Sequence, residues 1–133
     1  MAENVFQLKI VTPERVFFDE PVQMVEFNTT EGEVGIYANH VPITLIISPG
    51  VLRITTAEGE KKAALHAGFV EVLPDKVTIL AEIIEWPDEI DEERATEAER
   101  RARERIAARQ DGVDLDRAEI SLKKAIARIN ALR

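Results

Sequence analysis

The chain has 133 residues, of which 45% are hydrophobic and 32% are charged, and its formal net charge is −8. This length fits one ordinary domain or a small domain with an appendage, and the acidic balance argues against nucleic-acid binding through phosphate neutralisation. Because cysteine is absent, disulfides, zinc thiolate sites and thiol nucleophiles are excluded. We find no signal-peptide pattern and no apolar run near the roughly 18 residues that span a bilayer, so we expect a cytoplasmic chain without direct membrane insertion.

Short apolar runs alternate with turn signals over the first two-thirds of the chain, which is typical of β-structure. Phe6, Leu8 and Ile10 follow the two-residue period of a half-buried strand. Further strands are expected at residues 16–18, 22–29, 34–36, 44–47, 51–56, 61–67, 68–73 and 77–84. About ten short strands at this spacing predict a β-sandwich or a flattened barrel. The predicted core comprises Phe6, Leu8, Val25, Phe27, Ile46, Leu52, Ile54, Leu65, Phe69, Val72, Ile79 and Ile83.

The composition changes at Trp86-Pro87, where we place the boundary between a β-domain of residues 1–86 and a helical domain of residues 87–133. After Pro87 the chain has no further proline and a single glycine, Gly112. Two helices are expected, joined through Gln110-Asp111-Gly112 into an antiparallel hairpin. Asp88 or Asp91 caps the first helix and Asp114 the second. On the first helix the residues that share one face are Ala95, Ala98, Ala102, Ile106 and Arg109, a stripe made mostly of alanine. On the second helix the expected apolar stripe is Leu115, Ala118, Leu122, Ala125, Ile129 and Leu132.

The alanine-rich stripe of the first helix permits close approach but buries little area. Isolated helices of this length are marginal in water, so the hairpin needs a surface to dock on, either the β-domain or a partner.

Candidate catalytic groups are sparse. His40 and His66 are the only histidines, and no paired histidine or carboxylate motif accompanies them. The chain has no glycine-rich phosphate loop and no Gly-x-Ser-x-Gly motif. We therefore do not expect an enzyme, and a small hydrolase using either histidine is the least supported class of function.

The run Ile90-Asp91-Glu92-Glu93-Arg94-Ala95 follows the boundary directly. Asp91 and Arg94 are neighbours on a helix, where they form either a simple surface ion pair or part of a ligand site. In a ligand site the carboxylate accepts from an amine or a ribose hydroxyl, and the guanidinium forks onto a phosphate. Lys124 and Arg128 on the second helix are further candidate cations.

Three motifs occur in an order that resembles a known family: Glu31-Gly32-Glu33-Val34-Gly35-Ile36-Tyr37 with His40-Val41-Pro42, then Gly68-Phe69-Val70-Glu71-Val72, then Val77-Thr78-Ile79-Leu80-Ala81-Glu82. The chain resembles the epsilon subunit of bacterial F-type ATP synthase over essentially its whole length. The resemblance implies a ten-stranded β-sandwich followed by an antiparallel two-helix hairpin. It also implies a non-catalytic rotor subunit, peripheral at the cytoplasmic face of the membrane, that contacts the gamma subunit and the c-ring.

The resemblance assigns c-ring contact to Glu31, Gly32, Glu33 and His40. On the simpler interpretation, the glycines and His40 only shape a turn. In this family the hairpin inhibits ATP hydrolysis when it extends into the catalytic head of alpha and beta subunits. The basic residues that would meet the beta subunits are Lys123, Lys124, Arg128 and Arg133. On composition alone, a solvated helix face is the favoured interpretation of this basic segment.

Bacillar members of the family bind ATP in the folded hairpin through an Ile/Leu-Asp-x-x-Arg-Ala motif, which residues 90–95 match in full. The resemblance implies an ATP site of Glu85, Ile90, Asp91, Arg94, Ala95, Arg101, Lys124 and Arg128. Lys124 stands where the pattern has arginine, and lysine supplies charge without a bidentate fork. ATP would be a regulatory ligand, with no catalytic cofactor and no protein metal site. A free-standing protein-binding or chaperone-like module that uses the hairpin is the alternative function.

Overall fold

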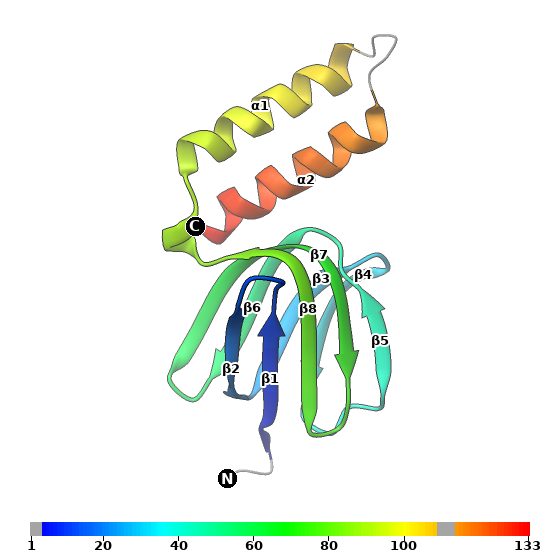
Figure 1. The fold of residues 1–133 in the computed structure, drawn as a ribbon, viewed down its shortest axis with the longest axis vertical. Coiled ribbons are helices and arrows are strands. Elements are labelled where there is room, and N and C mark those ends of the chain that lie inside the picture. Colours follow the sequence, from blue (N-terminus) through cyan, green and yellow to red (C-terminus); the bar gives the residue numbers. More distant parts are fainter. Residues whose placement is uncertain (1–3, 109–113) are drawn as a thin grey trace.

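The computed structural model describes residues 4–108 and 114–133, which form a β-domain with a helical hairpin resting on one end (Figure 1). The strands are β1 (Phe6–Val11), β2 (Val16–Val22), β3 (Met24–Thr29), β4 (Gly32–Tyr37), β5 (Ile43–Ile46), β6 (Gly50–Thr56), β7 (Gly59–Val72) and β8 (Lys76–Glu85). A 3-10 turn, η2 (Pro87–Glu89), then leads to α1 (Glu92–Ala108) and α2 (Leu115–Ala131). The predicted fold class, a β-sandwich followed by a two-helix hairpin, is confirmed.

The strands pair in the order β2-β1-β8-β7-β6-β3-β4, and β5 pairs with β7. All pairs are antiparallel except β1 with β8. The first half of β7 pairs with β6 and its last residues pair with β5, so this long strand contributes to both layers of the sandwich.

The described residues contain eight strands rather than ten, chiefly because residues 59–72 form one strand where we expected two. Gly68, the predicted break, instead lies at a bulge within β7. Its φ of +135° belongs to the region that favours glycine, and a Cβ there would meet the Leu80 carbonyl oxygen at 2.0 Å. The glycine therefore bends the strand without ending it.

Large aliphatic and aromatic side chains fill the core between the layers. Nine of the twelve predicted core residues are buried, but Ile46, Phe69 and Ile83 are 62%, 49% and 43% exposed. These three predictions were wrong because each side chain lies on the outer face of its strand. Apolarity alone does not identify which face of a strand turns inward.

The hairpin is docked, and α2 lies between the sandwich and α1 (Figure 1). The predicted caps are confirmed, because Asp91 Oδ1 accepts from the Arg94 amide at 3.1 Å and Asp114 Oδ1 from the Arg117 amide at 3.0 Å. The predicted stripes supply Ala95, Ala102, Ala118 and Ala125 to the buried interface, whereas Leu115 is 40% exposed. Arg109 and Gln110-Asp111-Gly112 lie outside the described residues.

A second buried face of α2 was not predicted. Ala131 packs against Val51 of β6 and Ala64 of β7, and Ile90 of the linker joins this small cluster. Ala127 is also buried. A helix covered on two sides has no single stripe, so its periodicity reports only part of its packing.

Neither described helix has the length and apolar composition that crossing a bilayer requires.

Candidate functional site

A cavity of about 360 Å³ opens where the last strand, the linker and both helices meet. It is lined by Glu85, Glu89, Asp91, Arg94, Ala95, Ala98, Arg101 and Arg128. These residues come from β8, η2, the residue that precedes α1, α1 itself and α2, so the cavity exists only while the hairpin is docked.

The structure brings together six of the eight residues assigned to the ATP site: Glu85, Asp91, Arg94, Ala95, Arg101 and Arg128. Ile90 instead packs in the apolar cluster with Val51, Ala64 and Ala131. Lys124 is not among the lining residues. Glu89 and Ala98 line the cavity but were not predicted; Ala98 follows Ala95 by one helical turn, which is a signal that sequence reasoning could have used.

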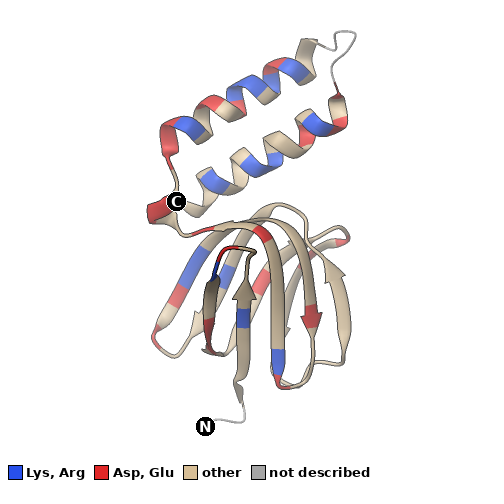
Figure 2. Ribbon diagram, in the orientation of Figure 1, with Lys and Arg blue, Asp and Glu red and all other residues tan. Residues whose placement is uncertain are grey.

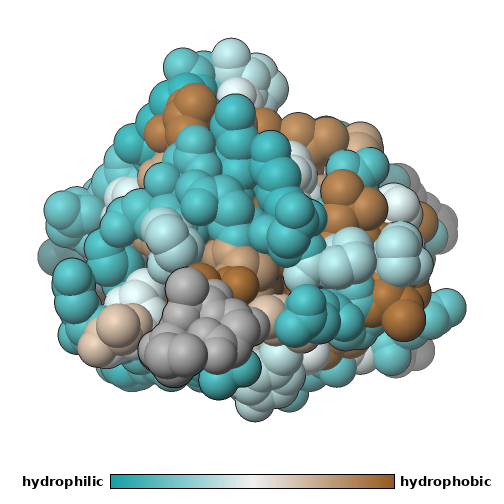
Figure 3. Space-filling model, turned by 90° about the horizontal axis from the view of Figure 1, so that it is seen from below, coloured by the Kyte–Doolittle hydropathy of each residue, from teal (hydrophilic) through white to brown (hydrophobic). Residues whose placement is uncertain are grey.

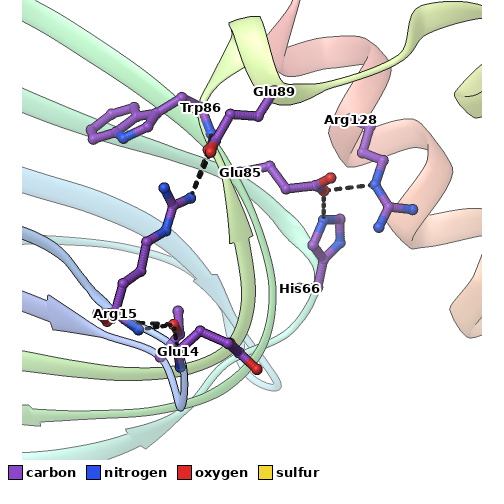
Figure 4. Close-up of polar contacts among 8 residues, drawn as sticks. Glu14, Arg15, His66, Glu85, Trp86, Glu89 and Arg128 are labelled. Atoms are coloured by element: carbon purple, nitrogen blue, oxygen red, sulfur yellow. Dashed lines mark hydrogen bonds and ion pairs between the residues drawn. The ribbon is translucent and has the colours of Figure 1, made fainter.

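Two of the lining carboxylates are already engaged with cations. Glu89 is hydrogen bonded to Arg15 Nη2 at 2.8 Å and accepts from the Trp86 amide at 2.9 Å. The Arg15 hydrogen bond, followed by that of the Trp86 amide, lowers the pKa of Glu89 below its usual value. Glu85 Oε1 accepts from Arg128 Nε at 2.7 Å (Figure 4).

Four of the five arginines of α1 fall into two groups. Arg100 and Arg103 form ion pairs with carboxylates of their own helix. Within the described residues, the side chains of Arg94 and Arg101 have no carboxylate at ion-pair distance, and both line the cavity. Arg128 binds Glu85 through Nε, which leaves its two terminal nitrogens for another acceptor. Three guanidinium groups thus meet in one cavity, an arrangement suited to a polyphosphate.

His66 is a functional candidate whose setting sequence reasoning missed. Its side chain is fully buried in β7, and Nε2 lies 2.9 Å from the same Glu85 oxygen that binds Arg128 (Figure 4). Burial lowers the pKa of this imidazole, an effect that the Glu85 hydrogen bond opposes. The sequence gives no sign of this contact because 19 residues separate the partners.

The residues assigned to c-ring contact lie along one edge of the sandwich. Glu31, Gly32 and Glu33 surround the β3–β4 turn, where Gly32 has a φ of +117°, and His40 follows the end of β4. Strand β4 is an edge strand whose six residues span about 20 Å, so the four residues do not form a single loop surface. His40 Nδ1 lies 2.7 Å from the Val41 carbonyl oxygen.

The four cations assigned to the beta subunits separate into two pairs. Lys123 and Arg133 line a second cavity, of about 480 Å³, together with Arg53 and Lys62 of the sandwich. Lys124 and Arg128 are half-buried on the side of α2 that faces His66. In the docked hairpin, therefore, the four do not form one exposed surface.

An apolar groove of about 530 Å³ crosses the outer face of the sandwich. Its exposed side chains include Ile46, Phe69 and Leu80, which are cross-strand neighbours on β5, β7 and β8. Seen from the end away from the helices, the surface also has hydrophobic side chains among polar ones (Figure 3). Exposed apolar surface of this kind marks protein–protein contacts.

The fold and these surfaces define a two-part protein, in which a β-sandwich carries a charged helical hairpin with a cation-lined cavity at the joint. The family model for the beta-sandwich domain of the ATP synthase delta/epsilon chain matches residues 5–87. The model for the long alpha-helix domain of the same chain matches residues 88–133. The chain belongs to the ATP synthase delta/epsilon family, which confirms the resemblance inferred from the three motifs.

Similar proteins agree with this assignment. The ATP synthase epsilon chain of Clostridium novyi is 45% identical over 93% of this chain and 95% of its own length. The ATP synthase epsilon chain of Natranaerobius thermophilus is 42% identical over 100% of this chain and 96% of its own length. A chain in the Euglena gracilis mitochondrial ATP synthase superposes with a TM-score of 0.84 at 25% identity, covering 97% of this chain and 82% of that one.

Proposed function

We propose that the chain is a coupling and regulatory subunit of the rotor of an F-type ATP synthase, peripheral at the cytoplasmic face of the membrane. The sandwich binds the gamma subunit and the c-ring, and the hairpin regulates ATP hydrolysis by the alpha and beta subunits. The match of both family domains over nearly the whole chain supports this role. A free-standing chaperone-like module has no comparable support.

The two rotor contacts use different surfaces of the sandwich. The apolar groove around Ile46, Phe69 and Leu80 offers the gamma subunit a hydrophobic area with cross-strand continuity. The edge strand β4 offers the c-ring polar groups at both ends, with Glu31 and Glu33 at one end and His40 at the other. Acidic side chains there pair with basic groups of the partner.

Release of the hairpin is the proposed regulatory step. Because the contact with the sandwich is made largely by alanines and a few linker residues, little apolar area resists detachment. Undocking would free Lys124 and Arg128 from the His66 side and place them with Lys123 and Arg133 on an exposed helix. Such a helix can meet an acidic surface of the beta subunits.

ATP bound in the joint cavity would hold the hairpin in the compact state. Arg94, Arg101 and the terminal nitrogens of Arg128 bind the phosphates, and Asp91 accepts from the ribose or the adenine amine. A ligand that binds only the docked form stabilises it by mass action. Lys124 lies outside the lining residues, so its difference from arginine matters less for affinity than the sequence pattern implies.

The observation that carries the nucleotide proposal is the gathering of Arg94, Arg101 and Arg128 from two helices around one cavity. Calorimetric titration of ATP into the full chain tests it. We expect Arg94→Ala to weaken binding at least tenfold through the loss of a charge-assisted fork. Arg103→Ala is the matched control, because Arg103 lies on the same helix but pairs with Glu99. No binding to the unmodified protein, or equal binding to both variants, contradicts the proposal.

Inhibition by the hairpin has its own test. A chain ending at residue 87, assembled into the synthase, should retain gamma binding and raise the rate of ATP hydrolysis. Unchanged hydrolysis in the assembled complex shows that the hairpin does not inhibit.

A further inference from the structure

His66 lies where the sandwich, the hairpin and the cavity share a polar contact. Its Nε2 and Arg128 Nε both bind Glu85 Oε1, at 2.9 and 2.7 Å. His66 lies in β7, Glu85 in β8 and Arg128 in α2, so this line of hydrogen bonds crosses the interface between the sandwich and the hairpin. Glu85 and Arg128 line the cavity, whereas His66 stands behind them, fully buried.

The second nitrogen of His66, Nδ1, is buried and has no hydrogen-bond partner among the described residues. The neutral tautomer with hydrogen on Nε2 donates to Glu85 and leaves only a lone pair unmatched at Nδ1. Protonation would place an N–H at Nδ1 with no acceptor within reach. A buried donor without a partner is costly, so the pocket accepts the neutral ring and penalises the charged one.

Some of the charged groups that face His66 favour the neutral ring, and one favours the protonated ring. Arg128 and Lys124 of α2 repel a second cation, whereas Glu85 of β8 attracts it. Burial is the largest influence, and the net effect lowers the pKa of His66. When the hairpin undocks, both cations leave, and the ring gains access to water at the uncovered surface.

We propose that His66 is a proton-sensitive positioning residue for the joint cavity. The Glu85 carboxylate, held by the neutral ring, fixes Arg128 for phosphate and α2 against the sandwich. A proton on the ring strengthens its attraction to Glu85 but sets a cation against Arg128 and Lys124 and leaves an N–H without an acceptor at Nδ1, so the docked position of α2 becomes less favourable. The effect on ATP rests on the function proposed above, whereas the effect on hairpin docking does not.

The direction of the pH dependence follows from proton linkage. A histidine with a lowered pKa in the docked state binds more protons in the undocked state, so docking strengthens as pH rises and weakens as pH falls below the ordinary value of about 6.5. For one proton the docking equilibrium changes at most about tenfold per pH unit. Acid therefore favours the released hairpin.

The test compares three full-length proteins: the unmodified chain, His66→Gln and His40→Gln. Glutamine keeps a donor for Glu85 but carries no charge at any pH, and His40→Gln removes the other histidine, which is not among the residues that line the cavity. Docking is read without nucleotide from hydrogen exchange of the α2 amides between pH 7.5 and 5.5, after correction for the intrinsic exchange rate. Calorimetry then measures ATP affinity over the same range.

In the unmodified chain and in His40→Gln we expect the docking equilibrium and ATP affinity to fall about tenfold toward pH 5.5. His66→Gln should lose most of this dependence. ATP gains a proton of its own near pH 6, but it does so equally for all three proteins, so the difference between variants is diagnostic. Equal pH dependence of docking in all three overturns the role of His66.

The two proposals fail in distinguishable ways. If ATP binds no form of the protein but docking still depends on His66, the nucleotide site is wrong and the proton effect stands. If ATP binds with the same pH dependence in His66→Gln as in the unmodified chain, the positioning role is wrong and the nucleotide site stands. A proton NMR titration of the unmodified chain gives a readout independent of any variant: a His66 ring that titrates at its ordinary pKa overturns the proposal.

Discussion

The sandwich and the hairpin bury different kinds of residue. The sandwich encloses large side chains such as Leu8, Phe27 and Ile54, whereas in the described parts of α1 and α2 every buried residue is an alanine. Charged residues are distributed in the opposite way to large buried side chains: acidic and basic residues are dense along α1 and α2 and sparser over the strands (Figure 2). The sandwich therefore has a core of its own, whereas the hairpin depends on its contacts to keep its position.

The magnitudes support this difference. Burying a large aliphatic or aromatic side chain contributes about 1.5–3 kcal/mol, whereas each methylene-sized group contributes about 0.8. Six buried alanines therefore supply far less than the sandwich core, and helices of seventeen residues need external packing to persist. The comparison predicts that the sandwich folds without the hairpin but that the hairpin does not order without the sandwich.

The largest expected effect lies in the sandwich core. Phe27→Ala should lower the free energy of unfolding by about 3–5 kcal/mol, because it removes a buried ring and leaves a cavity. Phe69→Ala is the control, since that ring is 49% exposed, and it should cost well under half as much. Denaturant unfolding followed by circular dichroism measures both. Equal losses would mean that the outer face is as important to stability as the core.

A charge placed under α2 should separate the two regions. Ala131→Glu puts a carboxylate against Val51 and Ala64, and an unpaired buried charge costs several kcal/mol. We expect the hairpin to undock, which faster hydrogen exchange of the α2 amides reports. The sandwich should keep its denaturation midpoint and the exchange rates of its strands. Ala107→Glu, at an exposed position of α1, should change neither. Collapse of the sandwich with Ala131→Glu would contradict the independence of its core.

The cap of α2 tests how marginal the hairpin is. Asp114→Ala removes the acceptor of the Arg117 amide and should weaken the helix by about 1 kcal/mol. Because α2 depends on docking, this modest loss should increase its amide exchange roughly fivefold without altering exchange in the strands. Unchanged exchange in α2 would show that the hairpin is more stable than its alanines imply.

The smallest effect is expected at the hinge. Arg15 ties Glu89 of η2 to the turn before β2, and Trp86 stacks on Phe17 with ring centroids 4.2 Å apart. Because the ion pair is exposed, Arg15→Ala should loosen only the linker, seen as a small change in Trp86 fluorescence. The lowered pKa of Glu89 means that the pair supports the hinge above the ordinary carboxylate pKa and is lost as pH falls through the lowered value. In Arg15→Ala most of this acid dependence should disappear, and only the part due to the Trp86 amide should remain.

Local signals predicted much of the fold. Alternating residues in β1, the caps at Asp91 and Asp114, and the change of composition at Trp86 all act over a few neighbouring residues. The same locality explains the errors. Ile46 and Phe69 have the apolar character of core residues, but which face of β5 and β7 turns inward depends on strands distant in sequence.

The candidate site divides in the same way. Asp91 and Arg94 are three residues apart and were paired by that spacing, and Ala95 was added by the family motif, whereas Arg128 reaches the cavity only because α2 folds back onto β8. The sequence could not show that Lys124 lies outside the cavity lining or that Ile90 lies in the apolar cluster. Both placements depend on which face of the docked segment turns toward the sandwich.

By itself the sequence determined the two regions, their secondary structure and their family, because these rest on local periodicity, capping and short motifs. Only the tertiary structure decided which faces are buried, how three arginines meet at the joint and how His66 comes to lie buried behind Glu85. Such contacts join residues 19 to 43 positions apart. Their energies arise from burial and proximity, which no single stretch of sequence encodes.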